Sequence, residues 1–222
     1  MEINNIREIE NLLKFQDKDS FYLAYVVKRV KDNDPWTWRN TENYSYSYFL
    51  RNEICIKCYI IKSLVQFYKY FPEIKELCIK CNARAYIVPS QKSLEKLKTL
   101  FANTLFDDDK YNLFFSKDTG ILLSQLINPE INNEKIYIID LDGENSRESY
   151  IEFLKNKILE FSDNHENEFR VFDTPNGSEL VILRPFDAAG FKAYCVKYRH
   201  GFSCNYDNGV LLYSNVKTKY EE

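Results

Sequence analysis

Histidine and glycine are scarce in this sequence. Among its 222 residues there are only two histidines, His165 in a polar loop and His200 beside Gly201. Both positions are typical of surface or turn residues rather than catalytic bases, so we do not expect a Ser or Cys hydrolase. None of the six glycines lies in a Walker-type phosphate loop or a dinucleotide-binding fingerprint.

The sequence also lacks long apolar runs and an excess of basic residues. No run is long enough to cross a membrane, and residues 1–5 lack the basic end and apolar centre of a signal peptide. We therefore expect a cytoplasmic, intracellular protein with no membrane partner. The formal net charge is −3, so any binding of nucleic acid must depend on a local patch rather than a global basic field.

The clearest chemical signal is an apolar run that ends in two carboxylates, Asp140 and Asp142. If residues 135–141 form a strand, side chains two residues apart point to the same face, so both carboxylates lie together at the end of the strand. The run is apolar on both faces, which is typical of a central strand covered on both sides. Hard divalent cations prefer carboxylate oxygens, so the pair is a candidate Mg2+ or Mn2+ site. A solvated exit from the strand is the simpler alternative.

Six cysteines include two C-x2-C pairs, Cys55/Cys58 and Cys78/Cys81, at a spacing that occurs in zinc sites. The first pair lies in an apolar segment typical of a strand, where its two side chains would face opposite sides. The second pair ends an amphipathic helix. We therefore expect small buried hydrophobic residues rather than a zinc site, and no structural disulfides in an intracellular protein.

Periodicity and turn residues predict one α/β (α+β) domain, in which a helical extension (residues 1–52) packs on a core (residues 53–222) with a mixed sheet and flanking helices. Helices are expected over residues 3–15, 21–31, 63–70, 73–80, 93–103, 120–127 and 147–161. Strands are expected over residues 54–62, 82–88, 135–141, 169–172, 180–183 and 210–213. Residues 32–52 and 106–117 are expected to be irregular, and Pro89 to Ser93 to form a turn.

The order of these segments resembles the catalytic core of archaeo-eukaryotic-type primases and primase-polymerases. In that family an apolar strand ends in Asp-x-Asp, a Thr-Pro-x-Gly turn leads into a strand that carries a histidine, and a later strand carries a further aspartate. The corresponding segments here are Asp140-Leu141-Asp142, Thr174-Pro175-Asn176-Gly177 with the run that follows it, and Tyr206-Asp207-Asn208-Gly209 with the apolar run after it. The resemblance extends over residues 82–214, and its upstream part is similar to small primase-like proteins of phages and mobile elements.

The resemblance implies a function and a set of site residues. Asp140 and Asp142 would hold Mg2+ or Mn2+, with Glu179 or Asp207 completing a site for nucleotidyl transfer. Glu179 stands where the family has its histidine, and Asp207 lies a few residues later than the third aspartate of the family. A pocket for a nucleotide, and for DNA or RNA, would be shaped by Thr174, Asn176 and Gly177, with Arg84, Lys92, Ser93 and Arg184 near phosphates.

Two other functions fit parts of the sequence. A primase-like protein that has lost catalysis and binds a protein partner would explain the altered motifs. A haloacid-dehalogenase-type phosphatase would use Asp140 as nucleophile and Asp142 as acid/base, but Glu144 stands where that motif has Thr or Val, and no convincing downstream Lys follows. An EF-hand calcium loop does not fit, because Gly143 comes too early.

Overall fold

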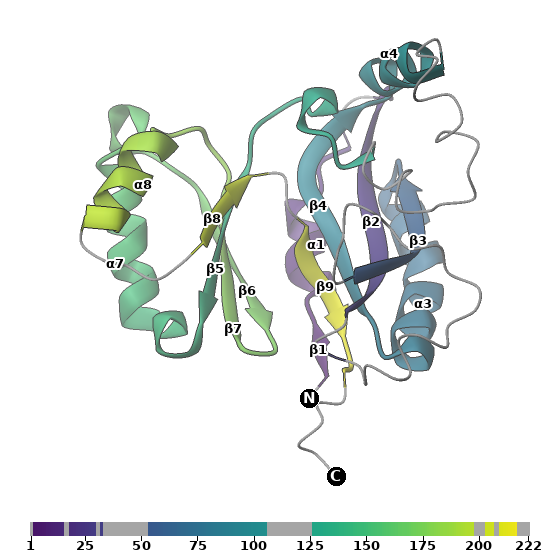
Figure 1. Ribbon diagram of the computed structural model, residues 1–222, viewed down its shortest axis with the longest axis horizontal. Coiled ribbons are helices and arrows are strands. Elements are labelled where there is room, and N and C mark those ends of the chain that lie inside the picture. The colour runs from purple at the N-terminus through teal and green to yellow at the C-terminus, as the bar shows by residue number, and fades with distance from the viewer. Residues whose placement is uncertain are drawn as a thin grey trace.

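The computed structural model describes residues 2–15, 18–29, 32, 53–105, 126–197, 203–206 and 209–216. Its strands form two sheets that lie next to each other (Figure 1). The predicted α/β (α+β) class is confirmed. All described strand pairs are antiparallel, so the expected single mixed sheet is instead two antiparallel sheets.

The first sheet has five strands in the order β1-β9-β4-β2-β3. It combines the N-terminal part of the chain with its last described strand. The strands are β1 (Ile3–Asn4), β2 (Ser20–Arg29), β3 (Glu53–Ile61), β4 (Arg84–Ser93) and β9 (Val210–Ser214).

Strand β2 corrects the helix that the sequence predicts over residues 21–31. It lies between β3 and β4 and is buried along most of its length. A continuous apolar run that is covered on both sides has no helical or strand periodicity of its own. Whether it forms a strand or a helix then depends on its β-branched and aromatic residues and on its two neighbouring strands. The segment predicted as a helical extension therefore contributes a central strand to the first sheet.

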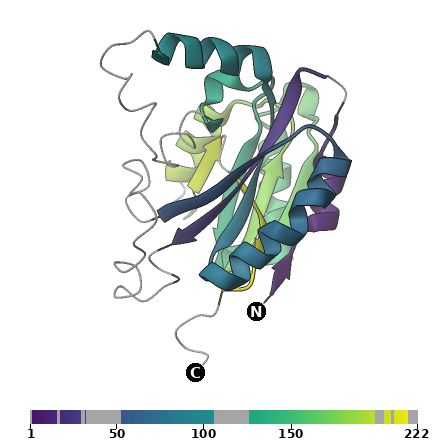
Figure 2. The same cartoon turned by 90° about the vertical axis from the view of Figure 1, so that its right-hand side faces the viewer.

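Helices cover both faces of the first sheet. On one face lie α1 (Ile6–Leu12) and α3 (Leu64–Cys81), and Figure 2 shows α3 running across the sheet. Pro72 lies inside α3, so the two helical segments predicted around it are one helix. Phe67 and Ile74, on either side of Pro72, are both fully buried against the sheet and hold the two halves in place. On the other face lies α4 (Leu94–Leu105).

Strand β4 continues through the turn predicted from Pro89 to Ser93. Its pairing with β2 passes from Val88, opposite Leu23, to Lys92, opposite Phe21, so the residues between form an irregularity of the strand. Proline occurs in sheets at such bulges because no ladder hydrogen bond is needed there. The turn signal in the sequence therefore marks a bulge, not the end of a strand.

The second sheet has the order β6-β7-β5-β8. Its chain order is β5 (Tyr137–Asp142), α7 (Glu148–Leu159), β6 (Phe169–Thr174), β7 (Gly177–Ile182), α8 (Ala188–Lys197) and β8 (Ser203–Tyr206). This βαββαβ sequence, with the first strand next to the third and the fourth, is the ferredoxin-like arrangement. Both helices pack on one face of the sheet, where an apolar cluster includes Ile139, Leu141, Ile158 and Phe191. The predicted strands, the hairpin and the helix over residues 147–161 are confirmed.

The opposite, helix-free face of the second sheet meets the first sheet near β9. One apolar cluster joins them, since it contains Ile138 and Val181 of the second sheet as well as Val210 and Leu212 of β9.

Short connecting segments complete this part of the chain: η2 (Pro129–Ile131), η3 (Gly143–Ser146) and η4 (Asp163–His165). None of the described helices is both long and apolar enough to span a membrane.

Several predictions fall on residues that the structure does not describe. These are the loop over residues 106–117, most of the helix over 120–127 and most of the irregular segment over 32–52.

The side chain of Asn5 links the two sheets. Its amide nitrogen donates to the carbonyl of Asp173 at 2.9 Å and to that of Leu211 at 2.8 Å, and Asn5 is only 4% exposed. These bonds satisfy one carbonyl in each sheet at the place where the sheets meet.

We expect Asn5→Ala to lower the free energy of unfolding by about 1–3 kcal/mol, because it leaves two carbonyls at the junction without this donor. Urea denaturation measures the loss. Asn4→Ala is the matched control, since its side chain accepts a 3.3 Å bond from the Ile6 amide on the surface and should cost less. An equal or larger loss in the control would contradict the role assigned to Asn5.

Candidate functional site

Asp140 and Asp142 lie at the C-terminal end of β5 with exposed side chains. They share the helix-free face of the sheet with Ile138, while Ile139 and Leu141 point to the helices. The sequence therefore predicted correctly that both carboxylates are on one face at the end of a strand. That face is the one turned toward the first sheet.

Glu179 is directly opposite Asp140 in the pairing of β5 with β7. It lies on the same helix-free face but is buried, with 8% of its surface exposed. One oxygen of its carboxylate accepts a 2.8 Å hydrogen bond from the Leu211 amide of β9. Glu179 therefore belongs both to the carboxylate group of the second sheet and to the contact between the sheets.

The pKa of Glu179 is raised from 4.5 to about 7. Burial is the main cause, because it penalises the charged form, and the negative charge of Asp140 adds to the rise. The hydrogen bond from Leu211 and the positive charges of Arg29 and Arg84 act in the opposite direction. Glu179 thus changes its charge near neutral pH, next to an exposed carboxylate.

Basic and phenolic side chains of the first sheet lie across from Glu179. Arg29 donates to the hydroxyl of Tyr86 at 3.0 Å and forms a 2.7 Å ion pair with Glu53. Arg84 is 5% exposed and binds Asp32 through two hydrogen bonds of 2.6 Å each. Arg84, which the sequence predicts near phosphates, therefore forms a buried ion pair with Asp32.

Gly209 lets two phenols pack closely at this place. Tyr25 and Tyr86 stack with ring centroids 5.6 Å apart. A Cβ on Gly209 would lie 2.6 Å from the hydroxyl oxygen of Tyr25 and 2.7 Å from the Cβ of Tyr86, so no larger residue fits. Burial raises the pKa of Tyr25 well above its ordinary value, which keeps this phenol neutral. The glycine turn predicted before the last strand therefore has a packing role.

The Thr174 to Gly177 turn, which the sequence predicts to shape a nucleotide pocket, lies beside Asp142. Gly177 is opposite Asp142 in the strand pairing, and the Asn176 carbonyl accepts a 3.0 Å bond from the Gly143 amide. A Cβ on Gly177 would lie 2.0 Å from the Leu141 carbonyl oxygen, so glycine is needed for the close approach of the two strands.

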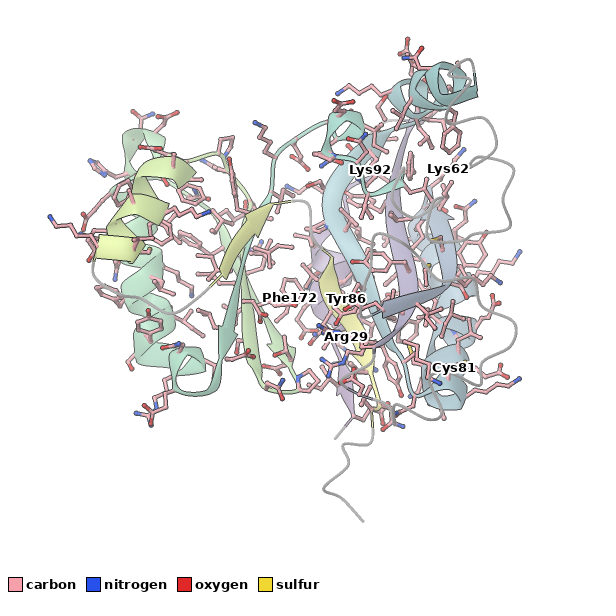
Figure 3. The ribbon with its side chains drawn as sticks, viewed as in Figure 1. Arg29, Lys62, Cys81, Tyr86, Lys92 and Phe172 are labelled. Atoms are coloured by element: carbon pink, nitrogen blue, oxygen red, sulfur yellow. The ribbon has the colours of Figure 1, made fainter. Side chains whose placement is uncertain are left out.

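The other residues predicted to bind phosphate do not join this group. Lys92 lies at the opposite end of β4 from Arg84, is fully buried, and donates to the Asn132 side chain at 2.5 Å; Figure 3 shows it well away from Arg29 and Tyr86. Ser93 accepts from the Lys96 amide at 3.2 Å within the first turn of α4. Arg184 follows the far end of β7 and pairs with Glu166 at 3.4 Å. Asp207 lies outside the described residues.

The two cysteine pairs lie on opposite faces of the first sheet. Cys55 and Cys58 pack with the cluster under α4, whereas Cys78 and Cys81 of α3 pack with the cluster on the other face. The four thiols are therefore not placed around one zinc ion. The prediction that Cys55 and Cys58 face opposite sides is wrong, because their sulfur atoms are 3.5 Å apart.

The functional residues that the sequence did not reveal are on β2 and β3. Arg29 was predicted to end a helix, so neither its position opposite Glu179 nor its pairing with Glu53 could be foreseen. A strand assignment for residues 20–29 would have placed Tyr25 and Arg29 on one face. The β-branched and aromatic residues of this run were the available signal for a strand.

The described residues contain no group of three or more His, Cys, Asp or Glu side chains placed to hold a metal ion. The arrangement instead offers two exposed carboxylates, with a third that is buried and already bonded to β9. Comparisons of the chain with protein-family models, with curated proteins and with solved structures found no match. The functional conclusion therefore depends on the geometry of these side chains.

We expect Glu179→Gln to change how stability depends on pH. Between the ordinary pKa of 4.5 and the folded value of about 7, the folded protein binds more protons than the unfolded chain, so stability falls as pH rises. At roughly 1.4 kcal/mol for each pKa unit, the full penalty above pH 7 is about 3 kcal/mol. Glutamine keeps an oxygen for the Leu211 amide and cannot ionise. The free energy of unfolding of the variant should therefore rise relative to that of the wild type between pH 5 and pH 8.

Urea denaturation at both pH values measures this difference. Glu144→Gln is the control, because Glu144 is exposed and pairs with Arg147 only on the surface. A Glu179→Gln variant with the same pH dependence as the wild type would show that the carboxyl group has an ordinary pKa.

Proposed function

We propose that the protein binds a nucleotide through a divalent cation held by Asp140 and Asp142, as a primase-like nucleotide-binding protein. The observation that carries this proposal is the position of both exposed carboxylates on the helix-free face of a ferredoxin-like sheet, with Asp140 opposite Glu179. The resemblance of the Asp140-Leu141-Asp142 segment and the Thr174 to Gly177 turn to primase motifs supports the same assignment.

Mg2+ and Mn2+ fit these donors. Mg2+ keeps several waters and is usually bound by one or two carboxylates together with phosphate oxygens of its substrate. Two exposed carboxylates are therefore enough for a site that is completed by a nucleotide. When bound, the cation neutralises phosphate charge and activates an attacking hydroxyl group, which is the chemistry of nucleotidyl transfer.

The surrounding residues have separate parts in this proposal. The turn at Thr174, Asn176 and Gly177 borders Asp142, because Gly177 is opposite Asp142 in the strand pairing. Glu179 adds negative charge beside Asp140 when it ionises. Arg29 and Arg84 balance that charge from the first sheet, which limits repulsion among the three carboxylates.

A second candidate is a primase-like protein that binds a partner without catalysis. The bond between Glu179 and the Leu211 amide favours it, because the third carboxylate is occupied in joining the sheets. Both candidates predict a folded ferredoxin-like unit. They differ in whether Asp140 and Asp142 bind metal and nucleotide, and then in whether DNA or RNA primers are extended.

Isothermal titration with Mn2+ and a nucleoside triphosphate tests the proposal. We expect metal-dependent binding in the wild type and at least a tenfold loss of affinity, about 1.4 kcal/mol, in Asp140→Asn/Asp142→Asn. Asp173→Asn is the matched control, because Asp173 is exposed at the same end of the same sheet but on its helix-covered face. Its affinity should match that of the wild type.

Absence of binding in all three proteins, with unchanged stability, would contradict the nucleotide-binding proposal. Equal binding in the wild type and the double variant would contradict the site. Binding that depends on Asp140 and Asp142 without extension of a primed template would leave a nucleotide-binding protein that is not a polymerase.

A further inference from the structure

Cys55 and Cys58 approach each other in a way that a regular strand does not allow. Residues three apart on a strand point to opposite faces of the sheet. Here both belong to β3, yet their sulfur atoms are 3.5 Å apart, and both are thiols. Something in the strand must therefore rotate one side chain onto the face of the other.

A β-bulge explains the contact. Cys58 is opposite Tyr25 of β2 and Cys55 is opposite Val27, so the three steps from Cys55 to Cys58 match two steps on β2. The pairing shifts between Val26 and Val27, which leaves Ile56 as the extra residue. Two strand residues span about 6.6 Å, and the Cα atoms of disulfides lie about 4.4–6.8 Å apart. A Cα separation of about 6.6 Å lies within the disulfide range, and the sulfur atoms already face each other at 3.5 Å.

We propose that Cys55 and Cys58 form a reversible intramolecular disulfide when the protein meets a peroxide. Cys58 is half-buried, whereas Cys55 is fully buried beside it. The Cys58 sulfur attacks a peroxide oxygen, the O–O bond breaks, and a sulfenic acid and one water form. The Cys55 sulfur then attacks Cys58, the S–S bond forms, and a second water leaves. The two thiols are oxidised, hydrogen peroxide is reduced to two waters, and a dithiol reductant reverses the change.

The second C-x2-C pair has the same spacing but a different environment. Cys78 and Cys81 lie on α3, and Cys78 is fully buried. Burial raises the pKa of the Cys78 thiol to about 12, with a further contribution from Cys81, so Cys78 is not a thiolate at neutral pH. This pair is therefore an internal control with the same sequence spacing on a helix.

The experiment treats the folded, fully reduced chain with hydrogen peroxide at neutral pH. Remaining thiols are then alkylated under denaturing conditions, and peptides are mapped by mass spectrometry. We expect the wild type to lose two hydrogen atoms in mass and to yield one peptide pair joined through Cys55 and Cys58. Dithiothreitol should restore the reduced mass.

Three variants complete the test. Cys58→Ser and Cys55→Ser should not gain the disulfide, and Cys81→Ser should form it as readily as the wild type. Circular dichroism establishes that each variant is folded, and Cys58→Ser is the safer of the first two because Cys58 is only half-buried. A wild-type protein that accumulates sulfinic acid at Cys58, keeps both thiols, or joins another pair of cysteines would overturn the proposal.

Discussion

The relative position of the two sheets depends on the backbone of Leu211 in β9. Its amide N–H donates to the carboxylate of Glu179, and its carbonyl accepts from the side chain of Asn5. Buried backbone N–H and C=O groups without partners would each cost free energy comparable to a lost hydrogen bond, so these two side chains make the contact between the sheets favourable. The apolar cluster shared by the sheets supplies the buried area, while the two polar side chains specify how the sheets meet.

This contact also determines the chemistry of the candidate site. Burial against β9 raises the pKa of Glu179, and Asp140 lies opposite it on the neighbouring strand. Asp140 and Asp142 stay exposed because they extend past the apolar part of the strand. The charge of Glu179 is balanced by arginines of the first sheet, whose own partners, Glu53 and Asp32, are acidic. The carboxylate of Glu179 therefore both joins the two sheets and lies beside the proposed cation site.

The sequence predicted the parts of the fold that depend on local signals. The apolar run before Asp140 is short and ends abruptly in polar residues, and the turn around Asn176 and Gly177 and the strand after Gly209 have turn residues beside them. The structure confirms all three. The sequence did not predict β2, because an apolar run covered on both sides has no period that distinguishes a buried strand from a buried helix. The pairing of Asp140 with Glu179, the bond from Leu211, and the bulge at Ile56 depend on partners far along the chain. No local pattern contains that information.

Paramagnetic broadening of backbone amide signals by Mn2+ locates a cation on the sheet, because the effect decreases steeply with distance from the ion. We expect substoichiometric Mn2+ to broaden the amides of Asp140, Leu141 and Asp142 first. The amides of Gly177 to Glu179 should follow, and then Leu211 across the junction. Broadening that begins elsewhere, for example around Glu130 or Glu166, or that persists unchanged in Asp140→Asn/Asp142→Asn, would contradict a cation site on the helix-free face of the second sheet.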